Sequence, residues 1–159
     1  MTPPRKKSGN YFKPEVGENR LRVISRPTRG FVGWVEEEGK RRPVRYAEGS
    51  KPKGVDAKYF WAFSVWDFGT ACVSVWEVTQ QSVLDQLEGL LTSPDWGCPT
   101  QYDLTVIREG TGLKTRYRLQ PGKRYELPED VLAKIASTYC DPDALLLGES
   151  PFEEPSDES

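Results

Sequence analysis

The sequence predicts a mainly β fold, a small antiparallel barrel with one inserted helix and a short C-terminal helix. Short segments that alternate apolar and polar residues are separated by glycine and proline turns, as in antiparallel sheets. Two other segments carry apolar residues at helical spacing. With 159 residues, the chain is long enough for one domain with an appendage at each end.

The predicted elements follow one another along the chain as strands, helix, strands and helix. Strands are predicted over residues 20–26, 31–37, 43–46, 59–68, 72–78, 102–108 and 113–119. Helices are predicted over 80–91, capped by Thr79, and over 128–138, with Val131, Leu132 and Ile135 inward. A Greek-key barrel with one helix between its strands is the OB arrangement, which we favour over a sandwich or another small barrel.

The charges lie in blocks along the chain. The formal net charge is −2, but the net charge is +8 over residues 1–58, −6 over 59–107, +4 over 108–126 and −8 over 127–159. This asymmetry indicates a polyanionic partner for the basic blocks, unless the blocks neutralise each other within the fold. We predict a basic flexible arm over 1–16, a folded domain over 17–148 and an acidic disordered tail over 149–159.

The composition excludes several classes of protein. The chain has no histidine, which removes histidine-based catalytic triads and histidine zinc sites. Its three cysteines form no CxxC pair, so neither a zinc site nor a disulfide scaffold is expected, and a reducing cytoplasm is predicted. No apolar run approaches the roughly 18 residues of a membrane span. We expect no metal and no cofactor.

An enzymatic alternative rests on carboxylates in the centre of the chain. Asp67 and Glu77 could meet across the predicted 59–78 hairpin, and with Asp95 and Asp103 they could hold Mg²⁺ in a nuclease. However, these four acids stand in no DxD or ExK spacing, and no lysine lies near them. We therefore predict no catalytic residues and treat the nuclease as the less favoured alternative.

Aromatic and basic residues favour a single-stranded nucleic acid as the ligand, because bases stack on flat rings while cations hold phosphates. Residues 113–119 predict one face with Leu113, Thr115, Tyr117 and Leu119 and another with Lys114, Arg116 and Arg118. Segment 59–68 is aromatic on both faces, so one face must be covered by a helix, the arm or a ligand. We expect Tyr59, Trp61 and Phe63 outward. Trp34 and Tyr46 are further platforms, whereas Trp76 and Trp96 are expected to be core or loop anchors.

Several strings resemble the single-stranded-DNA-binding proteins of tailed bacteriophages, OB-fold proteins that destabilise DNA helices. They are RRPVRY (41–46), KYFWAFSVWDF (58–68), VWEVTQQSVLDQL (75–87) and WGCPTQYDLTVIREGTGLKTRY (96–117). The resemblance covers about residues 17–122. It implies sequence-tolerant DNA binding in phage replication or recombination, and an acidic tail that contacts partner proteins. The best-known relative carries a zinc site of His and Cys, which this sequence cannot form.

We therefore predict a non-enzymatic DNA-binding domain in the host cytoplasm. Phosphates are assigned to the cations Arg20, Arg22, Arg41, Arg42, Arg45, Lys114, Arg116 and Arg118. Bases are assigned to some of the aromatic residues Trp34, Tyr46, Tyr59, Trp61 and Phe63. Lys58, Arg108 and Tyr117 lie in the strings that resemble the phage proteins and are added to the site. The alternative is a protein-interaction module, such as a host-takeover factor, whose basic strands bind an acidic protein.

Overall fold

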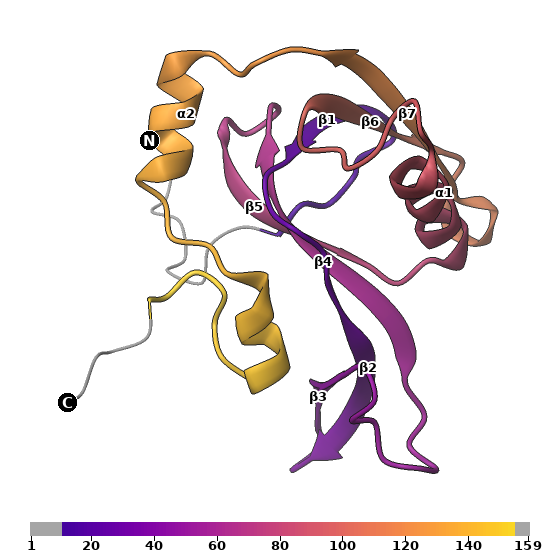
Figure 1. The fold of residues 1–159 in the computed structure, drawn as a ribbon. Coiled ribbons are helices and arrows are strands. Elements are labelled where there is room, and N and C mark those ends of the chain that lie inside the picture. The colour runs from indigo at the N-terminus through magenta and orange to yellow at the C-terminus, as the bar shows by residue number, and fades with distance from the viewer. Residues whose placement is uncertain (1–10, 155–159) are drawn as a thin grey trace, which may run out of the picture.

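The computed structural model of the chain describes residues 11–154 and is built mainly of antiparallel strands (Figure 1). The strands are β1 (Gly17–Val23), β2 (Thr28–Glu37), β3 (Lys40–Ala47), β4 (Lys58–Asp67), β5 (Cys72–Val78), β6 (Tyr102–Glu109) and β7 (Arg116–Arg124). The α-helices are α1 (Gln81–Thr92) and α2 (Glu129–Ala136), and short 3-10 helices are η1 (Gly112–Lys114) and η2 (Pro142–Leu147). The prediction of a mainly β, antiparallel fold is confirmed.

Strand β4 organises the sheet. It pairs with β2 and β1 along one edge and with β5 along the other, while β1 continues to β6 and β7, and β2 to β3. Every pairing between these strands is antiparallel. Within residues 11–154 the sheet does not close on itself, because β3, β5 and β7 each pair with a single strand. A closed barrel, as expected from the sequence, is therefore not formed by these pairings.

Helix α1 packs along the free edge of β7. It buries Val83, Leu84 and Leu87 against the sheet, in agreement with its predicted apolar stripe. Its Gln86 amide donates to the Tyr117 carbonyl at 3.0 Å and accepts from the Leu119 amide at 2.9 Å. The side chain thus satisfies the free edge of β7 as a neighbouring strand would.

Both faces of β4 are buried, because two different elements cover them. Trp61, Phe63 and Val65 face the main core, on the side of α1. Phe60 and Ala62 form a second cluster with Leu145 of η2. In Figure 1, α1 and the C-terminal segment accordingly lie on opposite sides of β4. The second aromatic face that the sequence left unassigned is therefore covered by the chain's own C-terminal segment.

The folded region extends beyond the boundaries predicted at residues 16 and 148. Phe12 is buried against Trp76, and its amide donates to the Val75 carbonyl at 2.7 Å. At the other end, the Pro151 carbonyl accepts from the Asp141 amide, and Phe152 packs edge-on against Tyr11. Segments 11–16 and 149–154 thus pack on the folded region through Phe12, Pro151 and Phe152, while most of their other residues are exposed. The rest of the predicted arm and tail, 1–10 and 155–159, lies outside the described residues.

Three predicted elements differ in detail. Strand β7 starts at Arg116 rather than at Leu113, because residues 112–114 form the 3-10 helix η1. Leu113 is therefore fully exposed instead of facing inward. Helix α1 starts after Gln80, without the predicted Thr79 cap. No residue of α2 is buried, and Leu132 remains 47% exposed. The predicted packing of Leu132 is therefore wrong, because α2 stands off the sheet.

Candidate nucleic-acid interface

The strand register divides the predicted site residues between the two faces of the sheet. Residues directly opposite each other on paired strands share a face, and alternate residues along one strand do so as well. Trp66 of β4 opposes Arg22 of β1, so these two side chains share a face. Every second residue along either strand lies on that same face. Eight predicted residues share this outward face: Arg20, Arg22, Trp34, Arg41, Arg45, Lys58, Arg116 and Arg118.

The opposite, inner face holds seven predicted residues: Arg42, Tyr46, Tyr59, Trp61, Phe63, Arg108 and Tyr117. The prediction that Trp61 and Phe63 point outward is wrong, because they are 3% and 0% exposed in the core. Periodicity permitted either face, and the apolar stripe of α1 selects this one. Tyr59 is half-buried and donates to a Glu48 carboxylate oxygen at 3.1 Å. Its burial raises the pKa of the phenol.

Other inner-face cations are already engaged. Arg108 is half-buried and donates to the Pro14 carbonyl at 3.1 Å. Arg42 is exposed but forms a two-pronged ion pair with Glu37, at 3.0 and 2.9 Å. This pair lowers the pKa of Glu37 and raises that of Arg42. Arg29, which is not among the predicted site residues, covers the Trp61 ring with its guanidinium carbon 4.4 Å from the ring centroid.

Trp34 is the most accessible aromatic side chain on the outward face. It lies on the β2–β3 hairpin, opposite Pro43, and is 57% exposed. The Arg41 guanidinium carbon lies 5.4 Å from its ring centroid. A flat ring beside a cation offers a stacking surface and a phosphate donor together. In Figure 1 this hairpin projects at the lower end of the sheet.

At the other end of the outward face, Arg116 and Arg118 are both exposed on β7, as predicted. Arg118 lies 3.6 Å from Glu109, a distance at which an exposed ion pair contributes little to stability. No ion pair engages Arg116, Lys58 or Lys114 within residues 11–154. Lys114 lies in η1 rather than in the strand. These cations are therefore available to an anionic ligand.

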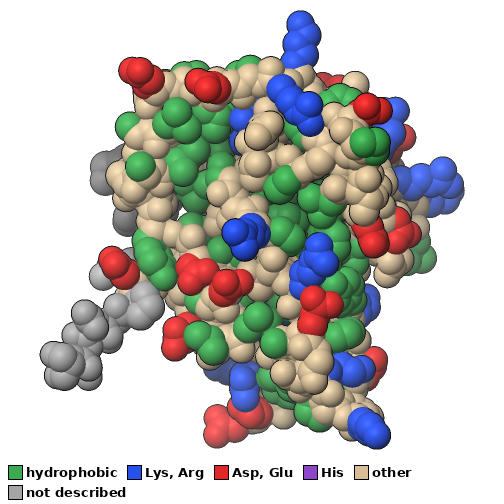
Figure 2. Space-filling model, in the orientation of Figure 1, with side chains coloured by type: hydrophobic (Ala, Val, Ile, Leu, Met, Phe, Trp, Pro, Cys, Tyr) green, Lys and Arg blue, Asp and Glu red, His purple; other side chains and the backbone are tan. Residues whose placement is uncertain are grey.

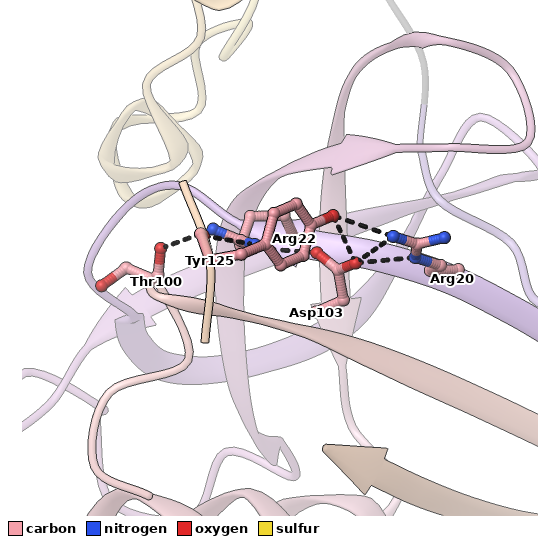
Figure 3. A network of polar contacts seen from close by, with 5 residues as sticks. All are labelled: Arg20, Arg22, Thr100, Asp103 and Tyr125. Atoms are coloured by element: carbon pink, nitrogen blue, oxygen red, sulfur yellow. Dashed lines mark hydrogen bonds and ion pairs between the residues drawn. The ribbon is translucent and has the colours of Figure 1, made fainter. Parts of the chain in front are cut away.

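A buried polar network joins β1, β6 and the segment after β7 (Figure 3). Arg22 is 2% exposed, and its Nε donates to Asp103 Oδ1 at 2.9 Å. Its terminal nitrogens donate to the carbonyls of Tyr125 and Thr100, at 3.1 and 3.4 Å. The assignment of Arg22 to a phosphate is therefore wrong, since its donors are used inside the protein.

Arg20 belongs to the same network but reaches the surface. Its Nε donates to Asp103 Oδ2 at 2.7 Å, and its Nη2 donates to the Tyr125 hydroxyl at 2.8 Å. The hydrogen bond to Asp103 is the main cause that raises the pKa of Arg20. Tyr125 is not among the predicted site residues, and Asp103 was predicted only as a candidate metal ligand. Asp103 is the one acid in the largely apolar segment 102–107. This isolated position could have indicated that Asp103 pairs with arginines inside the fold.

The carboxylates proposed for a nuclease are not brought together. Asp67 opposes Cys72 in the register, whereas Glu77 opposes Ala62 further along the hairpin. Glu77 is instead paired with Arg45, whose Nε donates to it at 2.7 Å. Residues 11–154 contain no group of three or more acidic or cysteine side chains that could hold a metal ion. This geometry gives the nuclease alternative no site.

The C-terminal segment covers the centre of the outward face. Leu145 packs on Phe60, and the Asp143 carboxylate accepts from the Thr28 hydroxyl at 2.5 Å. Gly30 permits this approach, because a side chain there would meet the Tyr46 carbonyl and Leu146. The same segment carries the acids Asp141, Asp143, Glu149, Glu153 and Glu154. This acidic segment thus packs against β2, β3 and β4 through η2.

The visible surface shows the resulting mixture of charges (Figure 2). Lys and Arg side chains are interspersed with Asp and Glu and with apolar atoms, and they do not form one uniform basic field.

Comparison of the chain with protein-family models, with curated proteins and with solved structures gives no match. No helix among residues 11–154 is long and apolar enough to cross a membrane.

Proposed function

We propose that the protein binds single-stranded DNA, with little sequence preference, through the outward face of its sheet. The observation that carries this proposal is the register, which gathers six accessible predicted contact residues on one face: Arg20, Trp34, Arg41, Lys58, Arg116 and Arg118. Exposed Trp34 beside Arg41 supplies a stacking platform, and Arg116 and Lys58 supply unpaired cations. Such a combination suits a polyanion with unstacked bases, because neither element reads sequence.

The strand connections support an OB-type domain as the scaffold. β1 pairs with both β4 and β6, β4 pairs with β5, β6 pairs with β7, and α1 lies between β5 and β6 in the chain. An OB fold is a partly open five-stranded Greek-key barrel. We propose that β1 and β2 together form its first strand, and that α1 closes the β5–β7 side through Gln86.

We propose that this activity serves phage DNA replication or recombination, as the resemblance of the sequence strings to phage proteins implies. In the same proposal, the acidic C-terminal segment has two roles: it competes with DNA for the outward face and it contacts partner proteins. Its position over Phe60, on the part of the outward face formed by β2, β3 and β4, supports the first role. A tethered competitor acts at high effective concentration.

Tryptophan fluorescence tests the proposal with the intact chain. Trp34 is exposed, whereas Trp61, Trp66 and Trp76 are buried, so base stacking should quench mainly Trp34. We expect titration with poly(dT) to quench emission and Trp34→Phe to remove most of that quenching. Similar affinities for poly(dT) and for mixed single strands, with weaker binding to duplex, are expected as well.

Absence of binding to any single strand at low salt would reject the proposed function. Binding to an acidic protein instead, with no response to DNA, would favour the interaction module. Cleavage of DNA that requires Mg²⁺ would favour the nuclease.

A further inference from the structure

We infer that a pocket beside Arg20, between β1, β6 and β7, binds a phosphate group. The pocket has a volume of about 420 Å³ and is lined by Arg20, Thr105, Gln120, Gly122 and Lys123, together with Glu18, Asp103, Pro121 and Tyr125. The inference rests on the proposed function for the source of the phosphate, and on the geometry of Arg20 for the site itself.

Arg20 is held in one orientation although its side chain is 54% exposed. Its guanidinium carbon lies 4.3 Å from the centroid of the Phe68 ring, which supports one face of the group. Nε and Nη2 are bound to Asp103 and Tyr125. Nη1 has no hydrogen-bond partner within residues 11–154. The arrangement fixes a charged donor before any ligand arrives, which reduces the entropy lost on binding.

The Asp103 carboxylate does not neutralise the positive charge that Arg20 brings to the pocket. Its Oδ1 accepts from Arg22, and its Oδ2 accepts from Arg20 and from the Tyr125 hydroxyl, at 2.7 Å. Buried Arg22 neutralises the acid from the protein side, so the charge of Arg20 remains in excess. With Lys123, three cations stand against the two carboxylates Asp103 and Glu18. A guanidinium with free N–H groups is well suited to phosphate oxygens.

A β-bulge forms the floor of the pocket. Tyr102 opposes Arg124 and Leu104 opposes Pro121, so Gly122 and Lys123 together oppose Asp103 alone. The extra residue interrupts the ladder and bends the strand, a device found beside binding sites.

Phosphate in this pocket can come from within a strand or from its end. Internal phosphodiesters and a terminal phosphate monoester share the same oxygens, and the Arg20 donors suit either. The two sources predict different effects of a 5′-phosphate on a short dT oligomer. An internal phosphate makes the affinity independent of that group, whereas a terminal one makes the phosphorylated oligomer bind more tightly.

The test uses the full chain with Arg20→Gln, Arg20→Lys and Tyr125→Phe. Arg20→Gln should weaken binding by about tenfold to a hundredfold, the effect of a charge-assisted hydrogen bond, and should make the salt slope shallower by about 0.7. Arg20→Lys should restore the slope but only part of the affinity, because lysine lacks the fixed fork. Tyr125→Phe should give a smaller loss, since it removes only the hydroxyl that orients Arg20.

Arg26→Gln is the matched control, because Arg26 is an exposed arginine between β1 and β2, outside the pocket. Folding is expected to survive Arg20→Gln, since Arg22 still neutralises Asp103; the melting temperature checks this. If the wild type binds DNA, a folded Arg20→Gln protein with the same affinity and the same salt slope would overturn the inference.

Inorganic phosphate separates this inference from the proposed function. If the wild type binds no DNA, the proposed function fails, and phosphate is then titrated while the backbone amide signal of Gly122, which lines the pocket, is followed by NMR. A shift in the wild type that is absent in folded Arg20→Gln supports the pocket on its own. No shift in the wild type, together with no DNA binding, overturns the inference as well.

Discussion

Trp34 is a single side chain on which base stacking can be tested without disturbing the core. It is 57% exposed, so its removal costs little packing. We expect Trp34→Ala to weaken binding of single-stranded DNA by about 1–3 kcal/mol, the range for one stacked base. The melting temperature should hardly change. A fluorescence-independent assay, such as anisotropy of a labelled dT oligomer, measures the affinity.

Trp61→Phe provides the opposite control for Trp34. Trp61 is 3% exposed in the main core and is covered by Arg29, so its replacement should lower the melting temperature and leave DNA contacts intact. If Trp61→Phe reduced affinity while Trp34→Ala did not, the stacking surface would lie on the inner face instead.

Arg22 and Arg20 differ in what they do, although they are two residues apart. Arg22→Ala should destabilise the protein by about 3–5 kcal/mol, because it leaves the Asp103 carboxylate short of a buried partner. Two carbonyls, of Thr100 and Tyr125, also lose their donor. Chemical denaturation measures the change. Arg20→Gln, which keeps the buried pair, should cost much less, and equal losses would contradict the division of roles.

At the scale of the elements, the contact between α1 and β7 has a specific test. Gln86→Ala should leave the Leu119 amide and the Tyr117 carbonyl without their partner, at a cost of about 1–3 kcal/mol for each buried group left unsatisfied. Urea unfolding measures this loss. Gln81→Ala on the same helix is the control, since exposed Gln81 bonds only to Asp85. Equal stability of the two variants would mean that water replaces Gln86 at the edge.

Charge substitutions are a better test than truncation of whether the C-terminal segment competes with DNA. Deleting residues after Gly148 would also remove Pro151 and Phe152, which pack on the folded region. Replacing Glu149, Glu153 and Glu154 by Gln keeps that packing and moves the formal net charge from −2 to +1. We expect tighter DNA binding, most clearly at low salt, because screening weakens the competition of the segment at high salt.

A second triple variant controls for net charge in this experiment. Asp85→Asn, Glu88→Gln and Asp95→Asn change the net charge by the same amount on and beside α1, away from the outward face. Isothermal titration at two salt concentrations compares the two variants. Equal tightening in both would show that the position of the C-terminal acids over the face is irrelevant.

The positions of strands and helices could be predicted from the sequence better than the direction in which the strand side chains point. The 72–78 strand and the helix after it agree within one or two residues, because alternation, turns and apolar spacing are local signals. The assignment of Trp61 and Phe63 failed because both faces of β4 are apolar, and only the positions of α1 and Leu145 decide between them. Asp103 was missed as an ionic partner because its two arginines lie more than 80 residues away in sequence.

The whole molecule determines how binding responds to salt. If the outward face neutralises about four to six phosphates, log K should fall with log[salt] with a slope of roughly −3 to −4, using about −0.7 per phosphate for single strands. Titrations of a dT oligomer over a range of salt concentrations measure the slope. A slope near zero would show that the basic ends of the face do not contact the backbone.

The contact between Tyr11 and Phe152 has a practical consequence for the design of the molecule. Their ring centroids lie 5.7 Å apart, so the first and last described parts of the chain meet on the same side of the sheet. A short peptide could therefore link the chain near Tyr11 to the chain near Phe152, and new ends could be opened at the exposed Gly110–Gly112 turn. Such a circular permutant should fold, and it would move purification tags and fluorophores away from the acidic C-terminal segment.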